Sequence, residues 1–93
     1  MAPVAHAAVV QVAIHPPSDA AHRRGILNDL VVPEVTSLPG FVRGMWLNDG
    51  NGTGTCVVVF ESEEAARAGL ATLTREGGPP VIGFGLHDVE VEA

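Results

Sequence analysis

Two segments of this chain are apolar at nearly every position, where most strands alternate apolar and polar residues. Residues 4–14 read Val-Ala-His-Ala-Ala-Val-Val-Gln-Val-Ala-Ile, and residues 55–60 read Thr-Cys-Val-Val-Val-Phe. Successive side chains of a strand point to opposite faces of its sheet, so continuous apolar runs indicate strands that are covered on both sides. The helical segments of the chain are enough to cover only one face of the sheet. We therefore expect a second copy of the protein to cover the other face.

The first helix is expected between two proline breaks. A strand over residues 4–15 stops at Pro16 and Pro17, which have no N–H for a sheet, and Ser18 can cap the helix that follows. Pro33 is expected to end or kink this helix near Val32. Its buried stripe is expected to consist of four aliphatic residues at helical spacing: Ile26, Leu27, Leu30 and Val31.

A hairpin and a second helix are expected in the next part of the chain. Residues 41–47 form a strand, and the glycine-rich residues 48–54 turn into a third strand over residues 55–61. Ser62 is then the N-cap of a helix over residues 65–75. Its narrow buried stripe is expected to consist of Ala66, Gly69, Leu70 and Leu73.

The last strand, over residues 81–91, changes phase along its length. Its first apolar positions share one face and its last ones, Val89 and Val91, share the other. Either a bulge near Gly85 to His87 causes the change, or the tail leaves its own sheet and meets a different environment, such as a partner subunit.

The order of elements is therefore β-α-β-β-α-β within one domain, residues 1–93. Short right-handed connections give this order a ferredoxin-like α+β plait, with a four-stranded antiparallel sheet. The first and third strands, the most apolar ones, lie centrally. Both helices lie on one face, which leaves the other face for a second sheet.

The composition narrows the range of partners. The 93 residues are 46% hydrophobic and 17% charged, with a net charge of −6, no lysine and five arginines. Nucleic acids and anionic membranes require clustered cations, so we expect neither as a partner. No segment has the length and apolarity of a signal peptide or a membrane span, so a cytoplasmic protein is expected.

The titratable residues give no metal or nucleophile signature. Cys56 is the only cysteine, which excludes an internal disulfide, and we expect it to be a buried, inert thiol. No histidine stands at metal-ligand spacing from another histidine or a carboxylate, so no metal is expected.

Two motifs carry a resemblance to a known family. Leu38-Pro-Gly-Phe-Val-Arg-Gly44, entering the second strand, and Val57-Val-Val-Phe-Glu-Ser-Glu-Glu-Ala-Ala66, from the third strand into the second helix, resemble the dimeric α+β barrel superfamily. Within it the chain is most similar to antibiotic-biosynthesis-monooxygenase-like (ABM-like) domains. The resemblance implies a homodimer whose sheets face each other, a pocket between sheet and helices in each protomer, and oxygenase chemistry that needs no cofactor.

Haem degradation, which some relatives perform, is not expected. Those members carry a Trp where this chain has Phe60 and an Asn on the first strand, where the nearest amide here is Gln11. They also carry a His after the second helix, and no His lies between Glu61 and Pro80.

Candidate pocket residues are Gln11, His15, Arg43, Trp46 and Phe60. Three of them have a structural alternative. His15 is either a general base at the pocket rim or an exposed loop residue. Arg43 either holds an anionic oxygen or protects an edge strand from aggregation. Trp46 either stacks on an aromatic substrate or anchors an interface.

Two functions remain open from the sequence. The first is a cofactor-independent, monooxygenase-like enzyme acting on a small organic substrate. A helix–sheet cavity filled by Phe60, Leu30 and Leu73 would exclude it. The second is a non-catalytic homodimeric module that binds a small apolar ligand or a protein partner.

Overall fold

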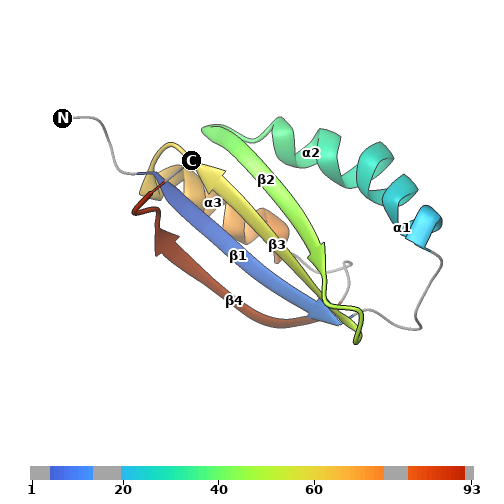
Figure 1. Cartoon of the computed structure of the whole chain (residues 1–93). Coiled ribbons are helices and arrows are strands. Elements are labelled where there is room, and N and C mark those ends of the chain that lie inside the picture. The colour runs from blue at the N-terminus through green and yellow to red at the C-terminus, as the bar shows by residue number, and fades with distance from the viewer. Residues whose placement is uncertain (1–4, 14–19, 75–79, 92–93) are drawn as a thin grey trace.

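The chain folds as an α+β plait, as expected (Figure 1). The computed structural model describes residues 5–13, 20–74 and 80–91. The elements are β1 His6–Ala13, α1 Ala20–Ile26, the π-helical segment η1 Leu27–Val31, α2 Val32–Thr36, β2 Phe41–Asn48, β3 Thr53–Phe60, α3 Glu63–Leu73 and β4 Val81–Asp88. Because α1, η1 and α2 follow one another without a break, they form one helical run, and the fold is the predicted ferredoxin-like β-α-β-β-α-β.

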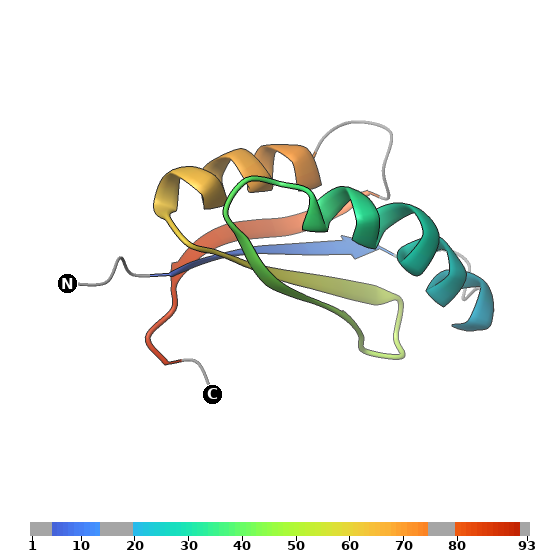
Figure 2. The same ribbon diagram turned by 90° about the horizontal axis from the view of Figure 1, so that it is seen from above.

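The four strands form one antiparallel sheet in the order β2-β3-β1-β4. The two most apolar strands, β1 and β3, are therefore the central pair, as predicted. Figure 2 shows α3 and the α1–α2 run on the same side of the sheet. We call this the helix side, and the opposite one the open face.

The main buried cluster lies on the helix side, and Ala7 and Val59 are also buried as a pair on the open face. Ser62 caps α3, its hydroxyl accepting a hydrogen bond from the backbone N–H of Ala65 at 3.1 Å. The helix then lies against the sheet through its predicted small-residue stripe, in which Gly69 and Ala66 are buried. The buried cluster consists of Ala8, Val35, Val58, Phe60 and Ala66.

The open face is apolar at its centre. Ala8 pairs with Val58 on the helix side, so the neighbouring pair Val9 and Val57 points to the open face. On the edge strand β2, Met45 and Leu47 point the same way and are 49% and 52% exposed. No element of the described part of the chain packs over these side chains.

The first helix departs from the prediction at Pro33. The helical run does not end there but continues to Thr36. The turn before the proline is widened, and the N–H of Val32 donates to the carbonyl of Leu27, five residues earlier. Pro33, which has no N–H to donate, stands at the start of α2 directly after this widened turn.

The predicted buried stripe of this helix is only half correct. Leu27 and Val31 are half-buried, and Val31 packs against the core. Ile26 and Leu30 are 42% and 66% exposed. A π-helical turn holds more residues than an α turn, so positions that would share one face of an α-helix separate.

One of the two predicted explanations for the phase change in the last strand is excluded, and the other stays a prediction. The register between β1 and β4 is regular from Gly83 to Asp88, so the bulge predicted near Gly85 to His87 is wrong. The irregularity lies opposite Gln11 and Val12, at the start of β4. β4 ends at Asp88, the N–H of Val89 still donates to the Ala5 carbonyl at 2.9 Å, and Val91 is 86% exposed.

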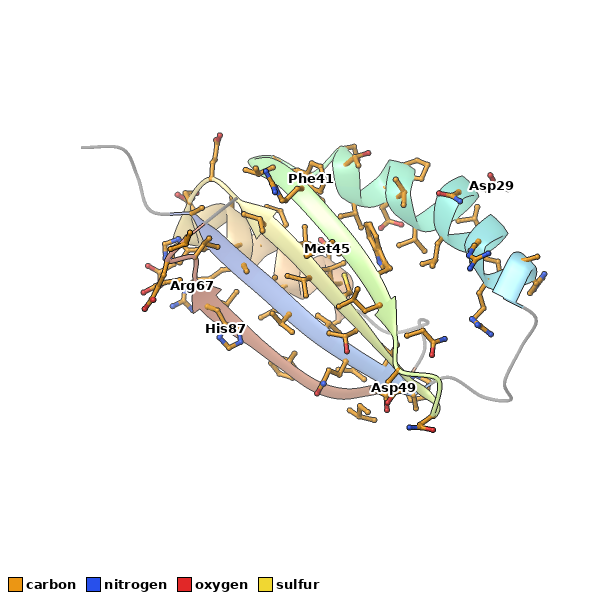
Figure 3. The ribbon with its side chains drawn as sticks, in the orientation of Figure 1. Asp29, Phe41, Met45, Asp49, Arg67 and His87 are labelled. Atoms are coloured by element: carbon orange, nitrogen blue, oxygen red, sulfur yellow. The ribbon has the colours of Figure 1, made fainter. Side chains whose placement is uncertain are left out.

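The β2–β3 hairpin turns within fewer residues than predicted, because β3 begins at Thr53. Asp49, labelled in Figure 3, closes the turn by accepting hydrogen bonds from the backbone N–H groups of Asn51 and Thr53. These donors lower the pKa of the Asp49 carboxyl from its ordinary value. Gly50 and Gly52 supply the positive φ angles, 78° and 94°.

Some predicted features lie outside the described residues, namely the Pro16-Pro17 break, the Ser18 cap, His15 and the end of the second helix beyond residue 74. In the described part of the chain, none of the helices has the length and apolar character needed to cross a membrane.

Replacing Gly69 by alanine tests the contact that seats α3 on the sheet. A Cβ at this position would overlap the ring of Phe60, which is fully buried and cannot move without displacing its neighbours. We expect Gly69→Ala to lower the free energy of unfolding by about 1–3 kcal/mol. Gly25→Ala is the matched helical control, because a Cβ there meets nothing within 4 Å. It should raise stability by about 0.5–1 kcal/mol. Equal changes in the free energy of unfolding for the two variants, measured in urea, would contradict the close contact between Gly69 and Phe60.

Candidate functional site

The described candidate residues lie on two sides of the sheet. Trp46 pairs with Cys56, and Phe60 belongs to the buried cluster, so both point to the helix side. Gln11 pairs with Thr55 in the alternate register, and Arg43 pairs with Val59, so both point to the open face. A single pocket on the helix side can therefore contain Trp46 but not Gln11 or Arg43.

Arg43 is exposed on the edge strand β2, between Phe41 and Met45. Figure 3 shows the labelled side chains of Phe41 and Met45 on this strand. The position agrees with the edge-protecting interpretation, in which a charged side chain discourages strand addition.

Trp46 is one of two partly exposed aromatic residues beside the core, with Phe41. It is half-buried and packs against the buried cluster. Its ring lies back along β2 over Gly44, so that a Cβ at Gly44 would stand 3.1 Å from Trp46 Cη2 and 3.5 Å from Phe41 Cε2. The absence of a side chain at Gly44 therefore allows the indole to lie close to the strand.

Phe60 is fully buried and contributes no accessible surface. Leu73 also packs against the core. Leu30, however, is 66% exposed and fills no space between helix and sheet. Filling of the helix–sheet cavity by Phe60, Leu30 and Leu73 would have excluded a ligand there. Phe60 and Leu73 are in place but Leu30 is not, so the cavity is only partly filled.

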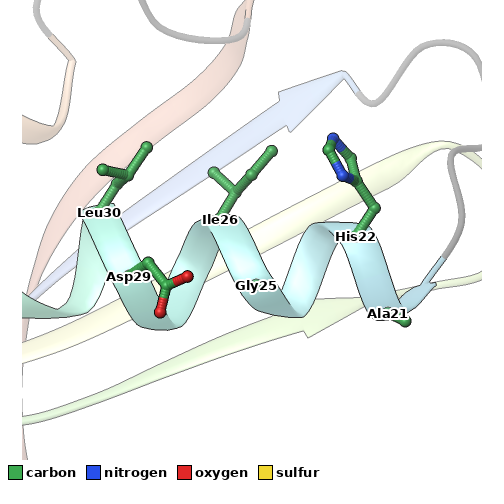
Figure 4. Close-up of a pocket in the computed structure, with 6 residues that line it drawn as sticks. All are labelled: Ala21, His22, Gly25, Ile26, Asp29 and Leu30. Atoms are coloured by element: carbon green, nitrogen blue, oxygen red, sulfur yellow. The ribbon is translucent and has the colours of Figure 1, made fainter.

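The helical run carries a shallow hollow along its exposed side (Figure 4). Its lining consists of Ala21, His22, Gly25, Ile26, Asp29 and Leu30. In Figure 4 the side chains of His22, Ile26 and Leu30 project from the same side of the helix. Across the helix side of the sheet, Phe84 of β4 is 67% exposed. The helix side therefore presents accessible apolar groups on both the helical run and β4.

A histidine–carboxylate pair links the two ends of neighbouring strands. His6 Nε2 lies 3.0 Å from Asp88 Oδ1, and the His6 side chain is 17% exposed. The sequence did not reveal this pair, because the residues are 82 positions apart and meet only through the β1–β4 register. Only the register of β1 with β4 reveals the pair, and the sequence does not give that register.

The first turn of α3 carries a charged pair, Glu63 and Arg67, close to this histidine. Glu63 accepts from Arg67 Nη2 at 2.7 Å. This hydrogen bond and the charge of Arg67 lower the pKa of Glu63, and the charge of His6 adds a small contribution. Both charged partners are exposed, so the pair contributes little to stability.

Cys56 lies on the helix side of β3, half-buried beside the core. Burial raises the pKa of its thiol to about 11, which leaves almost no thiolate near neutral pH. The residue is therefore chemically inert there, as expected.

Among the residues that the structure describes, no cluster of three or more His, Cys, Asp or Glu side chains could hold a metal ion. Nor does that part of the chain contain a buried polar or charged side chain. The chemistry available on the helix side is thus mostly apolar and aromatic contact.

Gly44→Ala tests whether this glycine sets the position of the indole. The added Cβ would lie closer to Trp46 than side chains normally approach, so the ring must shift by a few tenths of an ångström. We expect altered Trp46 fluorescence and near-ultraviolet circular dichroism, with stability lowered by about 1 kcal/mol. Gly85→Ala is the strand control, since its Cβ would meet only His87 Nε2 at 3.4 Å. Identical spectra for Gly44→Ala and the parent protein would refute the role.

Comparison with known proteins supports the fold. No protein-family model matches the chain, and no curated protein matches its sequence. Its structure is similar to the crystal structure of a monooxygenase from the gene ActVA-Orf6 of Streptomyces coelicolor in complex with the ligand Nanaomycin D. The TM-score is 0.64 at 19% identity, covering 97% of this chain and 91% of that one. The MEC-8 C-terminal RRM domain bound to AGCACA gives a TM-score of 0.48 at 13% identity, covering 95% of each chain, and we draw nothing from it. The chain thus shares the α+β fold of this monooxygenase.

Proposed function

We propose that this protein is a homodimeric, cofactor-independent monooxygenase of the ABM-like type, acting on a small organic substrate bound on the helix side of the sheet. The observation that carries the proposal is the fold shared with the ActVA-Orf6 monooxygenase over nearly the whole of both chains. Fold alone does not establish an activity, so the site must supply the rest of the argument.

The helix side suits a planar apolar substrate. Trp46 offers an aromatic ring that is accessible and held against β2. Ile26, Leu30 and Phe84 add exposed apolar surface on the same side of the sheet. Aromatic rings stack on one another with a gain beyond simple burial, so an aromatic substrate is favoured over an aliphatic one.

The reaction we propose is oxygenation of a quinol-type ring. A quinol and O2 give a hydroxyquinone and water: one oxygen atom enters the ring, and the other leaves with two hydrogens of the quinol. The substrate supplies all four electrons that O2 accepts, so no external reductant is needed. The protein would contribute by holding the ring in an apolar, water-poor site.

The homodimer is supported by the open face. Val9, Val57, Met45 and Leu47 place apolar side chains there without any described element over them. Exposed apolar surface of this kind marks an association site. A second sheet facing the first would bury it, and it would also give the tail after Asp88 a neighbouring surface to contact.

One observation favours the alternative, a non-catalytic homodimeric module that binds a small apolar ligand. In the described part of the chain, no polar or charged side chain is buried beside Trp46. In this alternative the same surface binds the ligand and releases it unchanged.

Binding and turnover can be separated because Trp46 is the only tryptophan of the chain. We expect Nanaomycin D to quench its fluorescence saturably, and a quinol-type substrate to take up one labelled atom from heavy-isotope O2. Trp46→Ala should lower turnover about tenfold, whereas Trp46→Phe retains most of it. Arg67→Ala, on the exposed surface of α3, is the control.

Saturable binding without O2 uptake would instead support the non-catalytic module. Turnover lost in Arg43→Ala but kept in Trp46→Ala would assign the chemistry to the open face.

The dimer is tested by placing a charge on the open face. Met45→Glu introduces a carboxylate at a half-exposed position, so the protomer should fold, but each dimer would bury two of these charges. We expect the dimer dissociation constant to rise at least about 100-fold, which corresponds to about 2.7 kcal/mol. Ile26→Glu, on the helical run, should remain dimeric. Sedimentation of the parent protein as a monomer at micromolar concentration would refute the proposal.

A further inference from the structure

The helical segment before α2 has few anchors to the rest of the molecule. We call α1 and η1 together, Ala20–Val31, the arm. None of its residues whose burial is described is buried, whereas Val35 of α2 is 3% exposed in the core. Val31, at the end of the arm next to α2, is half-buried against the core. The arm packs mainly along its own helical run, η1 against α1 and α2, and neither α1 nor η1 packs extensively on a strand or on α3. Such a segment has low local stability and can move without disrupting the core.

The arm joins α2 through the last π-helical turn of η1. The hydrogen bond from Val32 N–H to the Leu27 carbonyl spans five residues instead of four. Conversion of this turn to α geometry would rotate the arm by about one residue step, ~100°. Gly25 and Pro33 stand on either side of η1, so helix propensity is weak around the junction.

The arm also carries apolar side chains that the described structure leaves uncovered. Leu30 is 66% exposed and Ile26 is 42% exposed, and both project from one side of the helix (Figure 4). Phe84, on the helix side of β4, is 67% exposed. Movement of the arm over an apolar ligand would remove these groups from water at a gain of about 25 cal/mol per Å2 of apolar surface.

We propose that the arm is a lid, hinged where η1 meets α2, that closes over an apolar ligand on the helix side of the sheet. This inference rests on the proposed binding site and adds its regulation. Ligand binding and closure are coupled, because the ligand offers Ile26 and Leu30 an apolar surface that the free protein lacks. The lid would also exclude water from the ring that reacts.

Hydrogen exchange with Nanaomycin D as the probe tests the lid. We expect the backbone amides of residues 27–31 to be protected at least tenfold when the probe is bound, while those of α3 change little. Trp46 fluorescence reports binding in the same samples, so binding and closure are measured separately. Quenching of Trp46 without added protection at residues 27–31 would overturn the lid and leave the proposed function intact. Absence of any saturable quenching would overturn the lid together with the binding site.

A substitution at an exposed apolar residue of the arm gives a second test. Leu30→Ser removes a side chain that is mostly exposed in the free protein, so the melting temperature should hardly change. We expect the dissociation constant for Nanaomycin D to rise at least tenfold and the protection at residues 27–31 to disappear. Asn28→Ser is the matched control, an exposed position in the same π-helical segment, and it should bind like the parent protein. Tight binding by Leu30→Ser with unchanged protection would overturn the lid.

Discussion

The central pair of strands, apolar on both faces, is the constraint on which the rest of this structure depends. β1 and β3 pair over their whole length, so each successive pair of residues alternates between the helix side and the open face. Ala8 and Val58 are fully buried on the helix side, while Val9 and Val57 stay half-buried on the other. One chain can cover only one of these faces with its own helices, and this imbalance explains both the layered fold and the association that we propose.

The helix side is itself divided into a rigid and a loose half. α3 is fixed to the sheet, because Gly69 admits the ring of Phe60 and Ala66 is fully buried. In the other helical run, Val35 is the one buried residue among those described, and it anchors the run in the core. A protein that needs a constant core and an adaptable binding surface can obtain both from two helices that differ in this way.

Local chemistry in the sequence was sufficient for most of the fold. The proline and glycine breaks, the Ser62 cap and the double-sided apolar strands predicted the element order and the central position of β1 and β3. The errors came from features with no local signal. Ile26 and Leu30 look buried at α-helical spacing, and only the π-helical geometry before Pro33 separates them from Leu27 and Val31.

The candidate site was less predictable, because it depends on which face each strand residue occupies. A one-residue irregularity between Phe41 and Arg43 sets the phase of β2, and it places Arg43 on the open face. The same pairing brings Trp46 to the helix side. His6 and Asp88 meet only through the register of β1 with β4, which no spacing in the sequence encodes.

β2 connects the two faces through neighbouring residues. Met45 points to the open face and Trp46 to the helix side, so the same stretch of an edge strand serves both surfaces. An edge strand is held by hydrogen bonds on one side only and is the more mobile for it. In the dimer that we propose, packing against Met45 would restrain β2 and with it the indole that lies over Gly44. Association would then prepare the helix side for a ligand, although the two surfaces lie on opposite faces of the sheet.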